Sequence, residues 1–297
     1  MTYNLNQLDS IRHKLLFRTD ANSQIGLGHF YRSLSLAKML SGSYNITFAL
    51  SLPSDSLSEL LKYEGFGLIR LEKVEYIRFD DDFNNECKYD LGQLKGFDVV
   101  VLDGYSFGLT YQKAVSNAGM KCVIIEDSGQ GNYEVDMVIN HAPGLSPNNY
   151  CIENPDCLFA LGPQYALLRT EFLDASKGKP PLTRGLGKAF VYFGGADLKQ
   201  LTTTACKILL GNTSYEVVTI VNEKSEQYKG LLGLAEEFKQ RLTLRSQLSA
   251  SQMLTEMIDI ELAIVPCSGI LFECLAAQLK VISGFTIENQ LNVYNGF

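Results

Sequence analysis

The stretch KLLFRTDANSQIGLGHFYRSLSLAKMLSG, residues 14–42, determines how the chain is interpreted. Its apolar residues 15–17 predict a short strand, and a loop of small and polar residues follows. From His29 onward apolar residues recur every three to four positions, which predicts a helix with one apolar face. The stretch therefore has the form strand, glycine loop, helix, with a histidine where the helix begins.

Alternating strands and helices continue beyond this unit. In the first half, strands are predicted at 45–50, 67–71, 98–102, 121–125 and 135–139, with helices at 54–63 and 108–118. The second half has predicted strands at 189–193, 216–221, 242–244, 261–265 and 280–283, with helices ending near 210 and at 223–240, 248–258 and 270–278. This pattern indicates an α/β fold with two Rossmann-like domains, whose parallel sheets face a cleft between them. The proline- and glycine-containing segment 176–187 marks a linker between domains at 1–175 and 188–297.

Composition excludes several classes of protein. The chain has 297 residues, 46% hydrophobic and 20% charged, which is typical of globular proteins and long enough for two domains. A net charge of −7 argues against a nucleic-acid partner. Residues 1–13 lack the apolar run of a signal peptide, and no window reaches the length of a membrane span. We therefore expect a cytoplasmic protein without stable membrane insertion. Its seven cysteines have no C-x-x-C spacing and suit reduced thiols.

The glycine loop excludes two kinds of nucleotide site. Gly26-x-Gly28 lacks the third glycine of a dinucleotide fingerprint, because Tyr31 occupies that place. No G-K-[ST] follows, so the loop is not a P-loop. The loop is either an anion or sugar site built on backbone N–H groups, or a tight turn that needs glycine only for its backbone angles. Gly194-Gly195, after the first strand of the second half, offers a second place where phosphate could meet backbone N–H groups.

His29 is one of three histidines and is the candidate catalytic base. The dipole at a helix N-terminus opposes a charged imidazole and favours the neutral form, which can take a proton from water. The alternative is a histidine that caps or packs the helix.

Acidic residues collect where the predicted strands end. Asp20, Asp103, Glu126 and Asp127 are candidates to orient His29 or to bind sugar hydroxyls, and helix capping is the alternative role. They do not form a set of metal ligands. We place Glu273 in the first turn of a helix near Gly269, where a carboxylate can accept both hydroxyls of a ribose or can complement the helix dipole.

Several motifs resemble those of one family. They are Arg18 with Asp20, Ile25 to His29 with Arg32, Asp103 with Tyr105, Leu161 to Phe172, Gly194-Gly195 with Asp197, Glu273, and Asn289-Gln290. They resemble the PseG-type UDP-2,4-diacetamido-2,4,6-trideoxy-β-L-altropyranose hydrolases, relatives of the MurG-type glycosyltransferases with the GT-B fold. The resemblance runs from about residue 14 to 290. It implies a GT-B-like architecture and hydrolysis of a UDP-linked amino-deoxy sugar of pseudaminic acid biosynthesis to free sugar and UDP.

The resemblance also implies roles for individual residues. His29 would activate the attacking water at the anomeric carbon, without a metal or another cofactor. We expect catalytic roles for His29, Asp20 and Tyr105. We expect the substrate to be bound by Arg18, Gly26, Gly28, Arg32, Asp103, Tyr165, Arg169, Gly194, Gly195, Ser268, Gly269, Glu273, Asn289 and Gln290. The UDP would be held by the second half, with Glu273 on the ribose.

This chain departs from the family pattern before Glu273. Residues 266–271 read PCSGIL, where the family commonly has a loop of the A-G-G-S-T-T type, so diphosphate contacts would come mainly from backbone N–H groups and Ser268. Gly104 and Ser33 stand where the family commonly has a bulkier polar residue and a cysteine. The chain also ends sooner after Asn289-Gln290 than most relatives do. Two alternatives stay open: a UDP-sugar-dependent glycosyltransferase, and a non-catalytic nucleotide-sugar binding protein. The sequence leaves the oligomeric state open.

Overall fold

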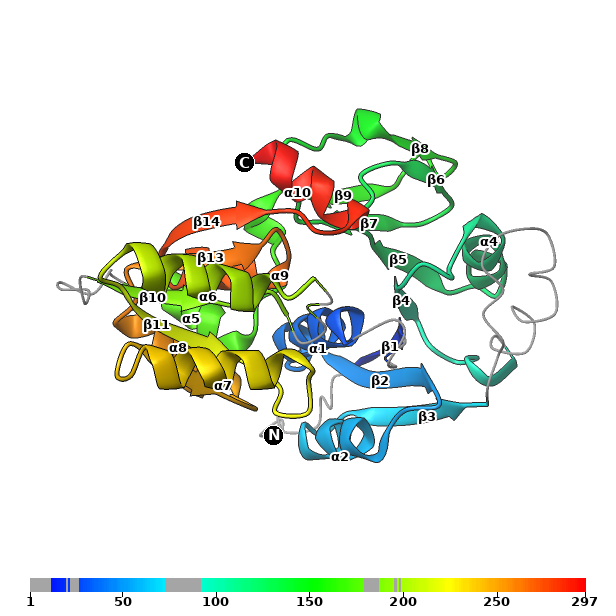
Figure 1. Cartoon of the computed structure of the whole chain (residues 1–297). Coiled ribbons are helices and arrows are strands. Elements are labelled where there is room, and N and C mark those ends of the chain that lie inside the picture. Colours follow the sequence, from blue (N-terminus) through cyan, green and yellow to red (C-terminus); the bar gives the residue numbers. More distant parts are fainter. Residues whose placement is uncertain are drawn as a thin grey trace, which may run out of the picture. The chain divides into compact units, whose positions relative to one another are not determined.

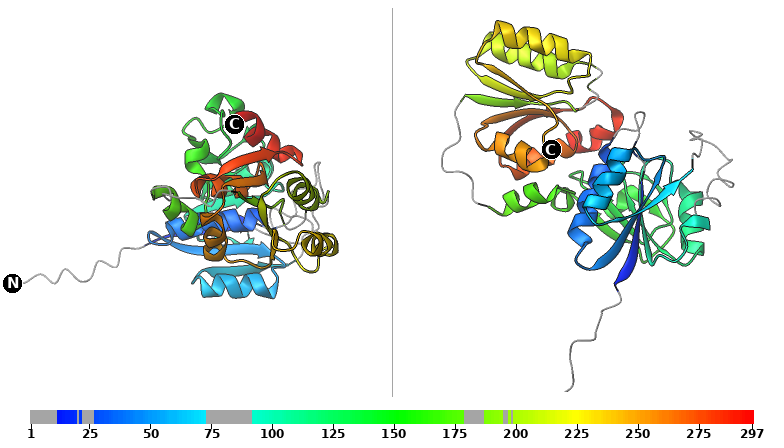
Figure 2. Two further views of the ribbon diagram at one scale, coloured as in Figure 1. Left: turned by 60° about the vertical axis from the view of Figure 1, so that its left-hand side comes forward. Right: turned by 90° about the horizontal axis from the view of Figure 1, so that it is seen from below.

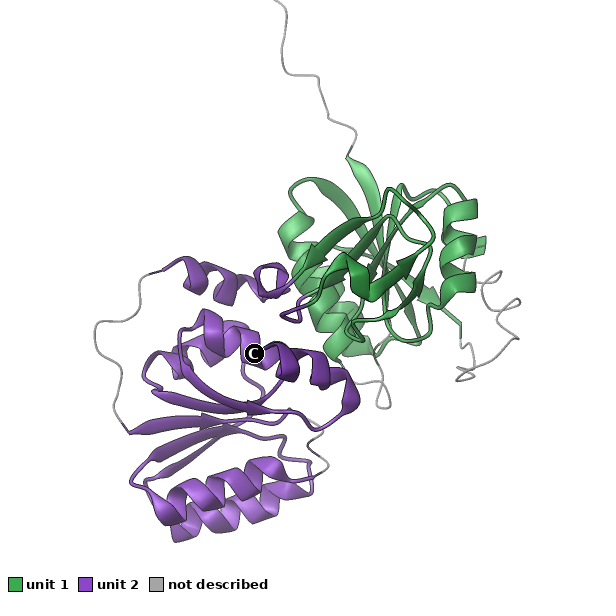
Figure 3. Cartoon of the chain, turned by 90° about the horizontal axis from the view of Figure 1, so that it is seen from above, with its two compact units in different colours: residues 1–140, 145–161 green, residues 141–144, 162–297 purple. Residues whose placement is uncertain are grey.

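The computed structural model describes residues 12–19, 21, 27–72, 92–178, 187–194, 197 and 199–297. The chain divides into two compact units, coloured separately in Figure 3. Unit 1 comprises residues 1–140 and 145–161, and unit 2 comprises residues 141–144 and 162–297.

Unit 1 contains a seven-stranded parallel sheet in the order β3-β2-β1-β4-β5-β7-β9. Its strands are β1 (His13–Thr19), β2 (Tyr44–Ser51), β3 (Gly67–Leu71), β4 (Val99–Asp103), β5 (Lys121–Ile125), β7 (Met137–Asn140) and β9 (Leu158–Leu161). A separate parallel pair joins β6 (Gly131–Tyr133) and β8 (Tyr150–Ile152). The strand order reverses between β1 and β4, so the loops that follow these two strands diverge there. In open α/β sheets this reversal is where ligands bind.

Helices cover both faces of the unit 1 sheet. Helices α1 (Gly28–Leu40) and α2 (Asp55–Tyr63) lie on one face, and α4 (Leu109–Asn117) lies on the other (Figure 2). Under α1, the rings of Phe17 and Phe48 stack with centroids 5.0 Å apart, and Phe30 of the helix packs on Phe48 at 5.8 Å. All three side chains are fully buried. This packing fixes the beginning of α1 above the carboxyl ends of β1 and β4.

Unit 2 contains a five-stranded parallel sheet in the order β12-β11-β10-β13-β14. Its strands are β10 (Lys188–Val191), β11 (Glu216–Ile220), β12 (Leu242–Arg245), β13 (Leu262–Pro266) and β14 (Lys280–Gly284). Helices α6 (Leu201–Asn212) and α7 (Gln227–Glu237) lie on one face; α8 (Ala250–Ile258), α9 (Gly269–Ala276) and α5 (Thr170–Lys177) lie on the other (Figures 1 and 2). Helix α10 (Leu291–Gly296) follows β14. Here the order reverses between β10 and β13.

The predicted α/β class with parallel sheets is confirmed, and most predicted elements are present within a few residues. Ser54 accepts a hydrogen bond from the Leu57 amide and caps α2. Ser249 forms a capping box with Gln252 at the start of α8. Strands β6, β8 and β9, the helix Thr170–Lys177 and helix α10 were not predicted. No helix in the described part of the chain combines the length and apolar character that crossing a lipid bilayer requires.

The contact-based division differs from the predicted domain boundary. Residues 162–177 group with unit 2, because α5 packs against α8 and α9. The predicted boundary lies after residue 175, in the linker 176–187. Residues 179–186 of that linker lie outside the described part of the chain.

Candidate active site

His29 lies at the point in unit 1 where the strand order reverses. It is the second residue of α1, and the helix places its ring against Asp103, the last residue of β4. His29 Nδ1 lies 2.7 Å from Asp103 Oδ1, and both side chains are buried. In the sheet, Asp103 pairs with Thr19, the last residue of β1. The beginning of α1 and the end of β4 thus bring the imidazole and its carboxylate together.

The hydrogen bonds around His29 favour one tautomer. The Arg32 guanidinium, which only donates, also lies 3.0 Å from His29 Nδ1 through Nη2. That same Nη2 lies 2.6 Å from Asp103 Oδ1, which is the better acceptor. An ionised Asp103 can only accept, so the 2.7 Å contact requires a proton on His29 Nδ1. The other ring nitrogen, Nε2, then carries the lone pair that a general base needs.

Asp103 is fully buried and ionised. Burial alone would raise its pKa, but the charge of Arg32 and hydrogen bonds from His29 and Arg32 outweigh burial and lower the pKa below its usual value. Arg32 Nε donates to both carboxylate oxygens at 2.9 and 2.8 Å, and Ser33 Oγ donates to Oδ2 at 2.9 Å. We expected Asp103 either to orient His29 or to bind substrate. Its side chain has no exposed surface and contacts His29 directly, which favours the first of these roles.

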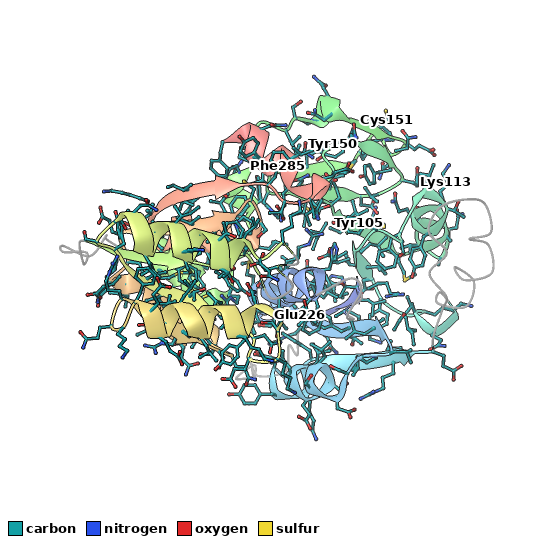
Figure 4. The ribbon with its side chains drawn as sticks, in the orientation of Figure 1. Tyr105, Lys113, Tyr150, Cys151, Glu226 and Phe285 are labelled. Atoms are coloured by element: carbon teal, nitrogen blue, oxygen red, sulfur yellow. The ribbon has the colours of Figure 1, made fainter. Side chains whose placement is uncertain are left out.

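Arg32 connects Asp103 with a second carboxylate at the carboxyl end of β5. Its Nη1 donates to Asp127 Oδ2 at 3.1 Å, and the Tyr105 hydroxyl donates to the same oxygen at 3.2 Å. Burial works to lower the pKa of Arg32, but Asp103 and Asp127 raise it above its usual value, so the guanidinium stays charged. Tyr105, just beyond β4 in Figure 4, packs edge-on against the His29 ring with centroids 4.8 Å apart.

A pocket of about 240 Å³ opens beside these side chains in unit 1. It is lined by His29, Arg32, Gly104, Tyr105, Phe107, Gly108, Gln112, Ile124, Ile125, Glu126, Asp127, Ser128, Gly131, Asn132 and Tyr133. The expected catalytic residues His29 and Tyr105 and the expected substrate contact Arg32 are therefore brought together. Sequence reasoning missed Phe107, Gln112, Asn132 and Tyr133. They follow β4 and β5 at positions without a motif, and only the strand order brings them to one place.

The structure does not place Arg18 in this pocket. Its side chain is buried, lies over the Phe107 ring at 4.9 Å and donates to Ser51 Oγ at 3.3 Å. Gly28 is the first residue of α1, and a Cβ there would meet nothing within 4 Å. The packing of unit 1 therefore does not require glycine at this position. Asp20 and Gly26 lie outside the residues that the structure describes.

In unit 2, small residues lie near the point where the strand order reverses. Gly194 follows β10 with a φ of +91°, a conformation that favours glycine. Ser268 and Gly269 follow the adjacent strand β13, at the beginning of α9. The Ser268 side chain makes no capping hydrogen bond to the helix, so the first amides of α9 are not capped by it. This arrangement suits an anionic group, which backbone N–H groups and the helix dipole would stabilise.

Gly194 does not lie at the start of a helix. Helix α6 begins at Leu201, and the Asp197 carboxylate accepts from the amides of Leu201 and Thr202, each at 2.9 Å. Asp197 therefore occupies the N–H groups at this helix start that a phosphate would use. Gly195 lies outside the described residues.

Glu273 is paired with Arg169 within unit 2. Arg169 Nε and Nη2 donate to the two oxygens of Glu273 at 2.6 and 2.7 Å. Burial works against the charge of Arg169, but the bond and charge of Glu273 raise its pKa above the usual value. Glu273 lies in the second turn of α9, not in the first turn as predicted, because the helix starts at Gly269. Arg169 and Glu273, which we expected to bind substrate, thus form an ion pair with each other.

Three other expected substrate residues belong to unit 2. Tyr165, in a short 3-10 turn, is 44% exposed. Gln290 is buried, and its Oε1 accepts from the Thr286 amide at 2.8 Å and the Thr286 hydroxyl at 3.2 Å, which closes the loop before α10. Asn289 precedes it in the same turn. In the described ranges, no three His, Cys, Asp or Glu side chains group as metal ligands would.

The sequence was compared with protein families and with curated proteins. No family model matches the chain. The UDP-2,4-diacetamido-2,4,6-trideoxy-β-L-altropyranose hydrolase of Campylobacter jejuni is 27% identical over 64% of this chain and 63% of its own length. An uncharacterized protein of Methanocaldococcus jannaschii is 24% identical over 96% of this chain and 58% of its own length. The chain thus spans less than two thirds of either curated relative.

Among solved structures, MurG of Acinetobacter baumannii aligns over 95% of this chain and 82% of its own, with a TM-score of 0.59 and 15% identity. The fold is GT-B-like. The sequence resembles a PseG-type hydrolase, as the motifs indicated.

Proposed function

We propose that this protein is a hydrolase that releases free sugar and UDP from a UDP-linked amino-deoxy sugar, with His29 as the general base. The observation that carries the proposal is the 2.7 Å hydrogen bond between His29 Nδ1 and the buried Asp103, beside a pocket at the reversal of the sheet. The name of the C. jejuni relative supports the substrate class.

In the proposed reaction, His29 Nε2 takes a proton from water as the water oxygen bonds to the anomeric carbon. The bond between that carbon and the leaving UDP breaks, and UDP departs with the bonding electron pair. Asp103 stabilises the imidazolium that forms and holds the ring in its orientation. Arg32 keeps Asp103 ionised through the whole step. A diphosphate is a stable leaving group, so no second carboxylic acid is needed to protonate it.

We assign the UDP to unit 2. Gly194, Ser268 and Gly269 would meet the diphosphate through backbone N–H groups, and Glu273 would accept from the ribose hydroxyls once it gives up part of its pairing with Arg169. Tyr165, Asn289 and Gln290 are proposed as neighbouring contacts. The product sugar would enter pseudaminic acid-type synthesis, in the cytoplasm.

The test is release of UDP from a panel of UDP-sugars in water, with and without added sugar acceptors and with EDTA. The proposal expects release with water alone, unchanged by EDTA. Release only when an acceptor is present would establish a glycosyltransferase instead. Binding of UDP-sugars without any turnover would establish a non-catalytic binding protein.

A further inference from the structure

Glu126 is a buried carboxylate that lines the pocket beside His29, and the proposed mechanism gives it no role. It directly follows β5, and only 7% of its surface is exposed. Burying a charge costs free energy unless hydrogen bonds replace the water that the charge loses. The partners of Glu126 therefore show which part of the protein it organises.

Two donors from neighbouring strands bind the first oxygen of Glu126. Its Oε1 accepts from the Tyr150 hydroxyl on β8 at 2.5 Å (Tyr150 is labelled in Figure 4) and from the side-chain amide of Asn140, the last residue of β7, at 2.7 Å. Burial and the charge of Glu126 raise the pKa of Tyr150 above its usual value, so the phenol keeps the proton that it donates. This oxygen connects the end of β5 to β7 and β8.

Three donors from the next two residues but one bind the second oxygen. Its Oε2 accepts from the Ser128 amide at 2.7 Å, the Ser128 hydroxyl at 2.8 Å and the Gly129 amide at 3.0 Å. The Glu126 side chain thus closes a turn around Asp127, which lies between Glu126 and Ser128 in the chain. The Glu126 amide donates to the Ile139 carbonyl at 3.1 Å, so the backbone is fixed before Asp127 as well as after it.

Asp127 is the residue of this turn that contacts the His29 site. Its Oδ2 accepts from Arg32 Nη1 at 3.1 Å and from the Tyr105 hydroxyl at 3.2 Å. Arg32 also donates to Asp103, the partner of His29, and the Tyr105 ring packs against the imidazole. The Asp127 carboxylate therefore connects the turn to two residues that surround His29.

We propose that Glu126 is a positioning residue: it fixes the turn that carries Asp127, and Asp127 holds Arg32 and Tyr105 in place around His29. The role of His29 in this statement rests on the proposed function. A carboxylate offers about four lone-pair sites, and five donors of the protein already bind the two oxygens of Glu126. Glu126 therefore leaves no site for a substrate, and it affects turnover only through Asp127.

A double-mutant cycle on kcat tests this link, because a residue that acts only through a second one loses its effect when the second is removed. Glu126→Gln keeps the size of the side chain but turns an NH₂ group towards other donors. For the UDP-sugar that is hydrolysed fastest, we expect Glu126→Gln to lower kcat about 10–10²-fold by misplacing the site, with KM nearly unchanged. In the Asp127→Ala protein, Glu126→Gln should lower kcat no further. Equal falls in kcat in both backgrounds would overturn the proposal.

Asp136→Asn is the matched control for a general loss of stability. Asp136 is also a carboxylate of unit 1 that accepts from a backbone amide, that of Cys122 at 2.8 Å, and it forms an ion pair with Lys121. It directly precedes β7, at the opposite end of the strand from Asn140, and does not line the pocket. Asp136→Asn should lower the melting temperature and leave kcat unchanged. A fall in kcat as large as that of Glu126→Gln would refute a specific role for Glu126.

Tyr150→Phe is the second variant, for the case that Glu126→Gln does not fold. It removes one donor from Glu126 and leaves the carboxylate in place. We expect a several-fold fall in kcat that disappears in the Asp127→Ala background. The same fall in both backgrounds would again contradict the link through Asp127.

Unfolding in urea gives a readout that needs no substrate. Glu126→Gln should destabilise the wild-type protein more than the Asp127→Ala protein, because in the latter the turn no longer contacts Arg32 and Tyr105. Additive losses of stability would overturn the proposal. Coupled losses in a protein that hydrolyses no UDP-sugar would support the link between Glu126 and Asp127 and refute the hydrolase.

Discussion

Each unit has its own parallel sheet, and the strand order reverses near the middle of both. Different kinds of residue lie at this point in the two units. In unit 1 the reversal holds ionised and titratable side chains: His29, Asp103 and Arg32 in direct contact. In unit 2 it holds the small residues Gly194, Ser268 and Gly269. Charged groups fixed by one another can move a proton, whereas backbone N–H groups stabilise an anion without taking part in chemistry. The same topology thus carries a buried histidine–carboxylate pair in one unit and exposed backbone N–H groups beside small residues in the other, which is the basis for the two roles that we propose.

The largest expected effect separates the two roles. His29→Ala should lower turnover by about 10²–10⁴-fold, the usual contribution of a general base. Affinity for UDP, measured by titration calorimetry, should stay within about twofold, because unit 2 holds the proposed UDP site. A variant that loses UDP binding would show that His29 holds the nucleotide, and the contrast between the units would then be wrong.

Asp103→Asn is expected to lower kcat by roughly 10²-fold or more, because an amide can donate to Nδ1 and stabilise the tautomer without a basic Nε2. It also leaves Arg32 buried without its main partner, so unfolding in urea should show a loss of about 3–5 kcal/mol. Ser33→Ala is the control: it removes one hydrogen bond to Asp103 and should cost about 1 kcal/mol with little change in kcat.

The ionised Asp103 carboxylate should make the stability of the folded protein depend on pH. The pKa of Asp103 is lowered in the folded protein, so its stabilisation is fully present above its unfolded pKa of about 3.9 and is lost as pH falls through the lower folded value. The Asp103→Asn protein lacks this contribution at every pH, so the stability of wild type should fall towards that of the variant as pH drops below about 4. Parallel stability curves for the two proteins would argue that Asp103 is not ionised.

Glu273→Gln tests whether the carboxylate of unit 2 acts on a ligand or only on Arg169. Breaking the ion pair is expected to cost roughly 1–3 kcal/mol of stability, because both side chains are mostly buried. If Glu273 also binds ribose, wild type should prefer UDP over 2′,3′-dideoxy-UDP, and the variant should lose that preference. Loss of stability with the preference intact would leave Glu273 a purely structural residue.

Ser268→Ala should have the smallest effect. Removing one hydroxyl contact should weaken UDP binding by about 1 kcal/mol, several-fold in Kd, with kcat unchanged. A fall in kcat without weaker binding would place Ser268 near the reacting atoms. Unit 2 would then contribute to catalysis as well as to UDP binding.

Much of the fold was predictable from local pattern. Strands β3 and β5 match the predicted residues because apolar runs there are bounded by turn residues and charges. The site was only partly predictable. Asp20, Asp103, Glu126 and Asp127 all follow predicted strands, and nothing local distinguishes the partner of His29 among them. The strand order makes Asp103 that partner across 74 residues.

The Arg169–Glu273 pair shows the same limit of prediction from local sequence. Both residues were recognised by motif, but as two separate ligand contacts. Their bidentate bond spans 104 residues and depends on how α5 packs against α9, which no local pattern records. Residue types and strand ends predict where polar groups gather; tertiary packing decides which of them bind one another.

Hydrolysis of the UDP-sugar in H₂¹⁸O tests the central claim most directly. If His29 activates water for attack at the anomeric carbon, mass spectrometry will find one ¹⁸O in the released sugar and none in UDP, and His29→Ala will release neither product at an appreciable rate. Label in the β-phosphate of UDP, or release at the wild-type rate by His29→Ala, would contradict the account.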